Sequence, residues 1–143
     1  QQPQQPQPQQ QPQQPQQQQA AGGQLPPTTV FEKSGVKIVF SFAKQPNAPN
    51  VTLINAVTTN ATPVALNNYT LQAAVPNYMK IQLAPASGNM VPPGGAGSVS
   101  QQMKIANSLY GQKPPAIRLK IDFVVNGRAI SDSVTVTNLP QGV

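Results

Sequence analysis

The segment Ile117–Val136, IRLKIDFVVNGRAISDSVTV, decides the fold class of this chain. Its first seven residues alternate apolar and charged side chains, with the period of two that is typical of a strand with one buried face. Asn126-Gly127 follows, a pair that favours the type I′ turn of a two-residue β-hairpin. The segment therefore predicts two antiparallel strands, over residues 117–125 and 128–136.

The two-residue turn also fixes the pairing register of this predicted hairpin. Arg118, Lys120 and Asp122 are expected on its polar outer face. Asp132 is expected on the core-side face opposite Ile121, a conflict that a bulge or an edge location would resolve. Because the two aspartates lie on opposite faces, they are not expected to form a carboxylate pair for acid–base catalysis.

Strand-like runs of the same kind fill most of the chain from Thr28 onward. Clusters of Pro, Gly and Asn separate them, and no amphipathic helix longer than about two turns is expected. Further strands are predicted over residues 36–43, 51–59, 69–75, 78–83 and 99–105. Seven or eight strands at this spacing favour an all-β, immunoglobulin-like antiparallel β-sandwich over a closed barrel, which would fit the uneven loops less well.

The N-terminal part of the chain has a different composition. Residues 1–19 contain only Gln and Pro, and no charged residue occurs before Glu32. A Gln/Pro segment has no large apolar side chains to bury, so residues 1–27 are expected to be a disordered, low-complexity hinge or linker. Residues 28–143 are long enough for one domain with a hydrophobic core and too short for two.

Composition also narrows the classes of function. The chain has no Cys and no His, so neither an enzyme activity nor a metal or other cofactor is expected. The Lys and Arg residues behind the net charge of +6 are scattered and lack an aromatic stacking motif. This pattern argues against nucleic acid and favours an acidic protein or peptide partner, or an anionic membrane surface nearby. No apolar stretch approaches the length of a transmembrane helix, so no direct membrane insertion is expected.

A second segment, Tyr69–Leu83 (YTLQAAVPNYMKIQL), reads as two short strands broken at Val75-Pro76. Its small and apolar side chains predict a shallow hydrophobic floor, beside the basic outer face of residues 117–123. Such a groove suits a short peptide with an aromatic anchor and acidic flanks. Leu83 shares the strand parity of Met79 and Ile81, so it either faces this groove or belongs to the core.

The sequence QAAVP at residues 72–76, followed by IQL at residues 81–83, resembles the ear domain of γ-adaptin, a clathrin adaptor subunit. The ears of the GGA adaptors are similar. The likeness covers nearly all of the predicted domain, and its supporting segments are residues 37–42, 102–107, 117–121 and 137–140.

This resemblance implies an eight-stranded, immunoglobulin-like sandwich that recruits accessory proteins by binding short aromatic/acidic peptide motifs. The rest of a clathrin adaptor is then expected upstream of the hinge. The implied setting is vesicle traffic, with the protein cytoplasmic and peripheral to trans-Golgi network and endosomal membranes and to clathrin-coated vesicles.

The resemblance also assigns peptide-binding residues by position. The apolar groove residues are Ala74 and Leu83, and the basic residues beside them are Arg118 and Lys120. Pro76 is expected to shape the turn between the two groove strands. The sixth assigned residue is Pro85, which stands next to the position of a groove proline in these ears.

Three positions depart from the family. Ala86 replaces that groove proline, Asn77 stands where these ears commonly carry Lys, and Asp122 replaces a third basic residue. Replacing a positive charge by a negative one at a groove rim, as Asp122 does, is expected to cost an acidic ligand about 0.5–1 kcal/mol. Lys80 would compensate if its strand face points toward the groove.

An extracellular immunoglobulin-like adhesion or structural module is the alternative. Three Asn-x-Ser/Thr sequons, at Asn50, Asn60 and Asn68, would carry glycans in that setting. The lack of cysteine fits a cytosolic protein better than a secreted one.

Overall fold

The computed structural model describes Pro3 and residues 25–143, so most of the predicted hinge, residues 1–27, lies outside the described residues. From residue 28 onward the chain forms eight strands and one short 3-10 helix. They are β1 (Thr28–Lys33), β2 (Val36–Gln45), β3 (Ala48–Asn60), β4 (Asn67–Ala74), β5 (Met79–Leu83), η1 (Pro93–Gly95), β6 (Ser98–Asn107), β7 (Ile117–Val125) and β8 (Arg128–Val136). Within the described residues, no helix has the length and apolarity needed to cross a membrane.

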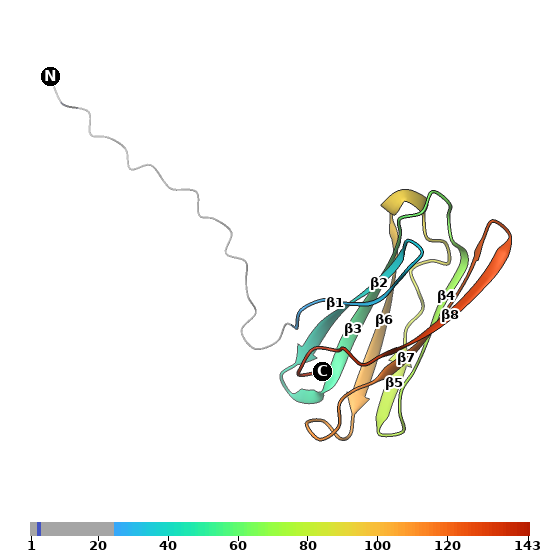
Figure 1. Cartoon of the computed structure of the whole chain (residues 1–143). Coiled ribbons are helices and arrows are strands. Elements are labelled where there is room, and N and C mark those ends of the chain that lie inside the picture. Colours follow the sequence, from blue (N-terminus) through green and yellow to red (C-terminus); the bar gives the residue numbers. More distant parts are fainter. Residues whose placement is uncertain (1–2, 4–24) are drawn as a thin grey trace.

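The strands form two antiparallel sheets that pack face to face (Figure 1). One sheet has five strands in the order β1-β2-β3-β6-β5, and the other has three in the order β4-β7-β8. The prediction of an all-β sandwich is therefore confirmed. Although β4 and β5 follow each other in the chain, they are edge strands of different sheets. The short loop between them carries the chain from one sheet to the other.

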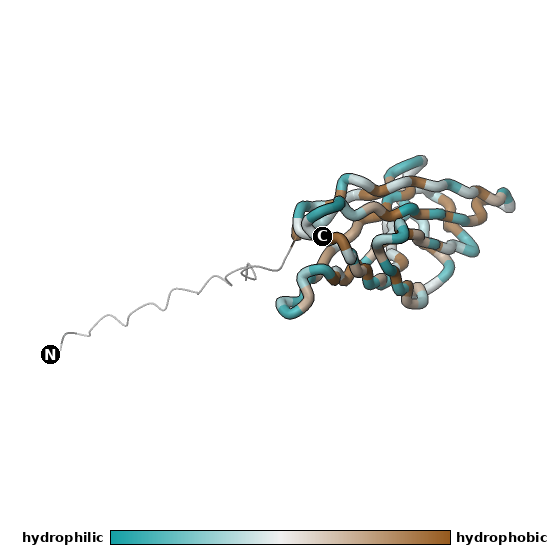
Figure 2. The backbone as a smooth tube through the Cα atoms, turned by 90° about the horizontal axis from the view of Figure 1, so that it is seen from below, coloured by the Kyte–Doolittle hydropathy of each residue, from teal (hydrophilic) through white to brown (hydrophobic). Residues whose placement is uncertain are grey.

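The core forms because apolar residues recur at every second position of most strands. Along β2, Val36, Ile38, Phe40 and Phe42 are buried. Figure 2 shows hydrophobic and hydrophilic positions alternating along the strands in the same way. The rings of Phe40 and Phe42 meet edge to face, with centroids 6.4 Å apart. Burial of one such side chain contributes about 1.5–3 kcal/mol to folding, so the alternating pattern selects which face turns inward.

The hairpin predicted at Asn126-Gly127 is present. Both turn residues have positive φ, 50° and 74°, as a type I′ turn requires. The register places Asp132 opposite Ile121, as expected from the sequence. Asp132 lies on β8, an edge strand, where the Lys33 Nζ donates a hydrogen bond to its Oδ1 at 2.9 Å. An edge location, rather than a bulge, therefore accommodates this carboxylate.

Two features of the five-stranded sheet differ from the sequence prediction. The segment 28–33 forms β1, joined to β2 by a second hairpin turn in which Ser34 and Gly35 have φ of 52° and 81°. The predicted gap over residues 44–50 is shorter, because β2 continues to Gln45 and β3 begins at Ala48. There the Lys44 Nζ donates a hydrogen bond to the Pro49 carbonyl oxygen at 2.6 Å, which stabilises the extended ends of both strands.

Candidate functional site

The residues that the sequence assigns to peptide binding lie on both sides of the crossing between the two sheets. Ala74 is the last residue of β4, and Leu83 is the last residue of β5. Pro76 lies in the loop that joins these strands, and Pro85 follows β5. The two basic residues lie on β7, the neighbour of β4 in the three-stranded sheet.

The closest association among these residues is between β4 and β7. Ala74 pairs with Arg118, and Gln72 pairs with Lys120. All four side chains are exposed, whereas Leu119, between the two basic residues, is fully buried. Because successive strand residues point to opposite faces, these four residues share the outer face of the three-stranded sheet. Gln72 was not assigned to the site, although its strand parity with Ala74 is visible in the sequence.

The loop between the groove strands is a tight turn with a fixed position. The Met79 N–H donates a hydrogen bond to the Pro76 carbonyl oxygen at 2.9 Å, which closes the turn. The Tyr78 hydroxyl donates to the Pro114 carbonyl oxygen at 2.7 Å, and the Ser108 hydroxyl donates to the Tyr78 carbonyl oxygen at 2.6 Å. The turn is therefore held to the segment that follows β6 rather than projecting freely into solvent.

Leu83 belongs to the other sheet. It pairs with Met103, which is buried, so its parity is that of the core face. However, β5 is an edge strand, and the Leu83 side chain is 38% exposed. Leu83 is therefore accessible to a ligand at the margin of its sheet. Pro85 is also exposed. It directly follows Ala84, whose N–H donates a hydrogen bond to the Gln102 carbonyl oxygen at 2.9 Å.

The charges around the site are unequal. The Lys120 Nζ lies 3.9 Å from the Asp122 Oδ2, so one rim cation is partly neutralised by a neighbour on its own strand. Arg118 makes no ion pair within the described residues. Lys80 does not compensate: it pairs with Ala106 and faces the outer surface of the five-stranded sheet, opposite in parity to Leu83.

The fold buries the asparagine of one of the three sequons. Asn60 is fully buried, and its Nδ2 donates to the Val64 carbonyl oxygen at 2.7 Å. Its Oδ1 accepts hydrogen bonds from the Thr62 N–H at 3.0 Å and the Thr62 hydroxyl at 2.6 Å. A glycan on this nitrogen would require the loss of that network, whereas Asn50 and Asn68 are exposed. Within the described residues, no three His, Cys, Asp or Glu side chains gather as metal ligands.

Residues 26–140 match the family model of the adaptin C-terminal domain, and the chain belongs to this family. Ear domains of this family are non-enzymatic interaction modules, which confirms the expectation that the chain is not an enzyme. The resemblance to γ-adaptin ears is confirmed as well.

Among its relatives is the AP-1 complex subunit gamma of Dictyostelium discoideum, with 46% identity over 113 residues, which are 78% of this chain and 12% of that protein. The human ADP-ribosylation factor-binding protein GGA3 is 31% identical over 120 residues, 80% of this chain and 16% of that protein. The chain therefore spans only a small part of the length of these relatives. The GAE domain of GGA2p from Saccharomyces cerevisiae aligns with a TM-score of 0.67 and 25% identity, over 79% of this chain and 96% of that one.

Proposed function

We propose that this chain is the ear of a clathrin adaptor and recruits accessory proteins by binding short aromatic/acidic peptide motifs. The observation that carries this proposal is the pairing of Ala74 with Arg118 on an exposed sheet face. It places a small apolar residue beside a guanidinium that makes no ion pair within the described residues. Membership of the adaptin C-terminal family supports the same function.

Binding would proceed by docking without chemistry. The aromatic side chain of the ligand packs against Ala74 and the exposed part of Leu83, which contributes about 1.5–3 kcal/mol. Pro76 and Pro85 fix the backbone at the two ends of β5. Arg118 and Lys120 attract the acidic flanks of the ligand and increase the rate of association.

A shallow site of this kind binds weakly, with a Kd on the order of micromolar to hundreds of micromolar. Weak binding is sufficient where many copies of an adaptor act together on one coat, because the effective concentration at the second site is high. The relevant setting is the cytoplasmic surface of trans-Golgi network and endosomal membranes and of clathrin-coated vesicles, with the rest of the adaptor upstream.

The extracellular module is less well supported. Its sequons would be glycosylated, but Asn60 lies buried in a hydrogen-bond network. Two measurements together separate the two functions. The intact mass of the chain secreted from cultured cells shows whether its sequons carry glycans, and a peptide titration shows whether the glycosylated or the unglycosylated chain binds the peptide. Binding of an aromatic/acidic peptide to the unglycosylated chain supports the adaptor ear, and binding that requires glycans supports the extracellular module.

A further inference from the structure

The outer face of the five-stranded sheet contains a hollow of about 530 Å³. Two rows of outward side chains border it, each running across neighbouring strands. The register aligns one row as Ala43, Leu53, Lys104 and Gln82, and the other as Ser41, Asn55 and Gln102. The residues between the rows, such as Ile54 and Met103, point into the core, so backbone forms the floor. We call this hollow the transverse trough.

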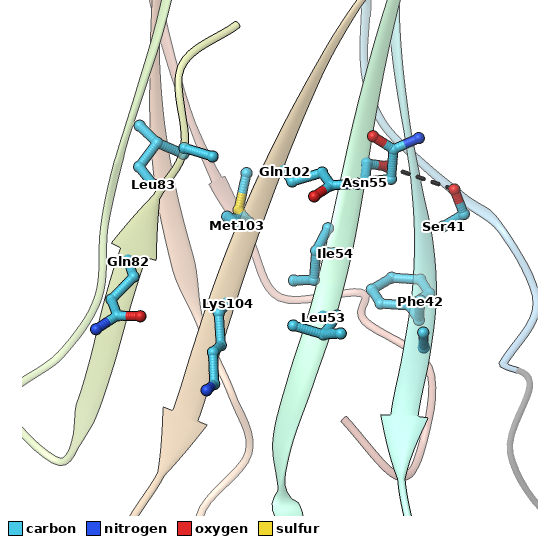
Figure 3. Close-up of a pocket in the computed structure, with 12 residues that line it drawn as sticks. Ser41, Phe42, Leu53, Ile54, Asn55, Gln82, Leu83, Gln102, Met103 and Lys104 are labelled. Carbon is cyan, nitrogen blue, oxygen red and sulfur yellow. Dashed lines mark hydrogen bonds between the residues drawn. The ribbon is translucent and has the colours of Figure 1, made fainter.

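The trough combines three kinds of contact. Leu53 is 39% exposed and lies beside Ala43, so this part of the trough is apolar. Asn55 and Gln102 line the opposite row with amide groups, which can bond the backbone of an extended peptide. Lys104 neighbours Leu53 on the next strand and supplies a cation. Figure 3 shows Leu53, Asn55, Gln102 and Lys104 arranged across the strands.

The charge on this part of the face is unbalanced. Lys80 lies on the same face as Lys104: it pairs with Ala106, two residue pairs along β5 and β6 from the Gln82–Lys104 pair. Of the chain's three acids, Asp122 and Asp132 belong to the three-stranded sheet, and Glu32 lies on β1, the far edge strand. Within the described residues, neither lysine makes an ion pair. The trough therefore has an apolar part and a cationic end.

We propose that the transverse trough binds an extended acidic peptide that carries an apolar residue and an acidic residue two positions apart. Neighbouring strands lie about 4.8 Å apart, and an extended peptide advances about 6.6 Å over two residues. A peptide that crosses the strands with its apolar side chain over Ala43 and Leu53 thus brings the acid within reach of Lys104. A hollow can receive one apolar side chain of a bound peptide. Binding to a bilayer would instead require apolar residues that protrude from the sheet, so the shape of the trough favours a peptide.

This site is separate from the groove and does not rest on the proposed function. The trough lies on the outer face of the five-stranded sheet, whereas Ala74 and Arg118 lie on the outer face of the three-stranded sheet. Leu83 borders both sites, because it lines one end of the trough. It is therefore left out of the test, and variants of Leu53 and Lys104 report on the trough alone.

The test is an NMR titration of the ¹⁵N-labelled chain with the peptide acetyl-Asp-Asp-Ser-Leu-Ser-Asp-Asp-amide, whose symmetry allows either direction of binding. We expect amide shifts at Ala43, Leu53, Gln102 and Lys104. Leu53→Ala should weaken binding about fivefold by removing apolar contact, and Lys104→Gln about threefold by removing the rim charge. The same peptide with Asn in place of Asp should bind more weakly than the acidic peptide.

Two matched variants on the same sheet face serve as controls. Val57→Ala shortens an apolar side chain of β3, and Lys37→Gln neutralises a cation of β2, both outside the trough. Neither should change the affinity. The proposal is overturned by a Lys37→Gln effect equal to that of Lys104→Gln, by shifts only at Ala74 and Arg118, or by no shifts at millimolar peptide. Lys104-dependent sedimentation with phosphatidylserine vesicles but no peptide shifts would also overturn it, since the face would then bind membrane.

Discussion

Ala74, the last residue of β4, lies directly opposite Arg118 of β7 on the exposed face of the three-stranded sheet. Side chains of directly opposed residues have Cβ atoms about 4.5–5.5 Å apart, so one ligand can touch both. An aromatic residue fits the first contact and an acidic residue fits the second. The proposed function depends on this pair and on the exposed edge residue Leu83.

Leu83→Glu should abolish binding of an aromatic/acidic peptide while the domain stays folded. The side chain is 38% exposed at the end of an edge strand, so a carboxylate there remains solvated. It would repel the acidic flanks and remove the apolar contact. The change in the free energy of unfolding should be within about 1 kcal/mol of zero. Peptide affinity by fluorescence anisotropy and urea unfolding measure the two quantities.

Met90→Glu is the matched control, because Met90 is 46% exposed and lies outside both proposed sites. It should leave peptide affinity unchanged. If Leu83→Glu unfolds the domain and Met90→Glu does not, Leu83 is a core residue and its assignment to the groove is wrong.

Arg118→Glu should weaken binding of the acidic peptide and reduce its dependence on salt. The guanidinium lies on the exposed sheet face beside Ala74, so its reversal places a negative charge where the acidic flank docks. A loss of about 0.5–1 kcal/mol is expected for a reversed rim charge. The affinity should be measured at low and high NaCl. Arg128→Glu, which makes the same charge change at the tip of the β7–β8 hairpin, should have little effect; equal losses would exclude a local role for Arg118.

Asp122→Asn should strengthen binding of the acidic peptide. The carboxylate lies 3.9 Å from the Lys120 Nζ and offsets the charge of that rim cation. Its removal should increase affinity about twofold to fivefold, the range expected for one exposed charge. Asp132→Asn changes the net charge equally but acts on the Lys33 pair in another part of the molecule. A similar gain in both variants would indicate a net-charge effect rather than release of Lys120.

Tyr69→Phe should destabilise the domain at neutral pH. The Tyr69 and Thr58 hydroxyls share a buried hydrogen bond of 2.6 Å, and the substitution leaves the Thr58 oxygen without this partner. The free energy of unfolding should fall by about 1–2 kcal/mol. Tyr110→Phe, at a position that is 38% exposed, should change it less.

The Tyr69→Phe variant should also lose less stability than the wild-type chain as the pH becomes alkaline. Burial raises the pKa of Tyr69 above its ordinary value of 10.0, and the hydrogen bond with Thr58 opposes this shift. The neutral phenol is thus favoured in the folded state. Its contribution to stability is complete below pH 10 and is lost as the pH rises through the folded-state pKa. Between neutral pH and about pH 11, the wild-type chain should lose more stability than Tyr69→Phe; an equal loss would contradict this assignment.

Local sequence patterns were sufficient for the parts of the fold that depend on neighbours in the chain. Asn126-Gly127 specified both a turn and a register, and this register located Asp132 correctly on the core-side face. Ser34-Gly35 forms a similar turn, with φ of 52° and 81°, yet the strand before it was not predicted. This strand, β1, has six residues, and only Val30 and Phe31 are β-branched apolar or aromatic. Its alternation is therefore too short to recognise.

The site was less predictable, because its properties depend on which strands form the edges of the sheets. Strand parity gives Leu83 the face of Met79, which is buried, and only the edge position of β5 makes Leu83 accessible. Parity likewise identifies Leu53 as an outward residue. The hollow beside it depends on the pairing of β3 with β2 and β6, which the sequence pattern of a single strand does not contain.

The most direct test of the proposed function is an NMR titration of the ¹⁵N-labelled chain with a short peptide that has a Phe-Gly-Pro-Phe core and acidic flanks. The proposed function predicts amide shifts that cluster at Ala74, Leu83, Arg118 and Lys120, and that disappear in the Leu83→Glu variant. No shifts at millimolar peptide, or shifts confined to residues far from the β4–β5 crossing, would contradict it.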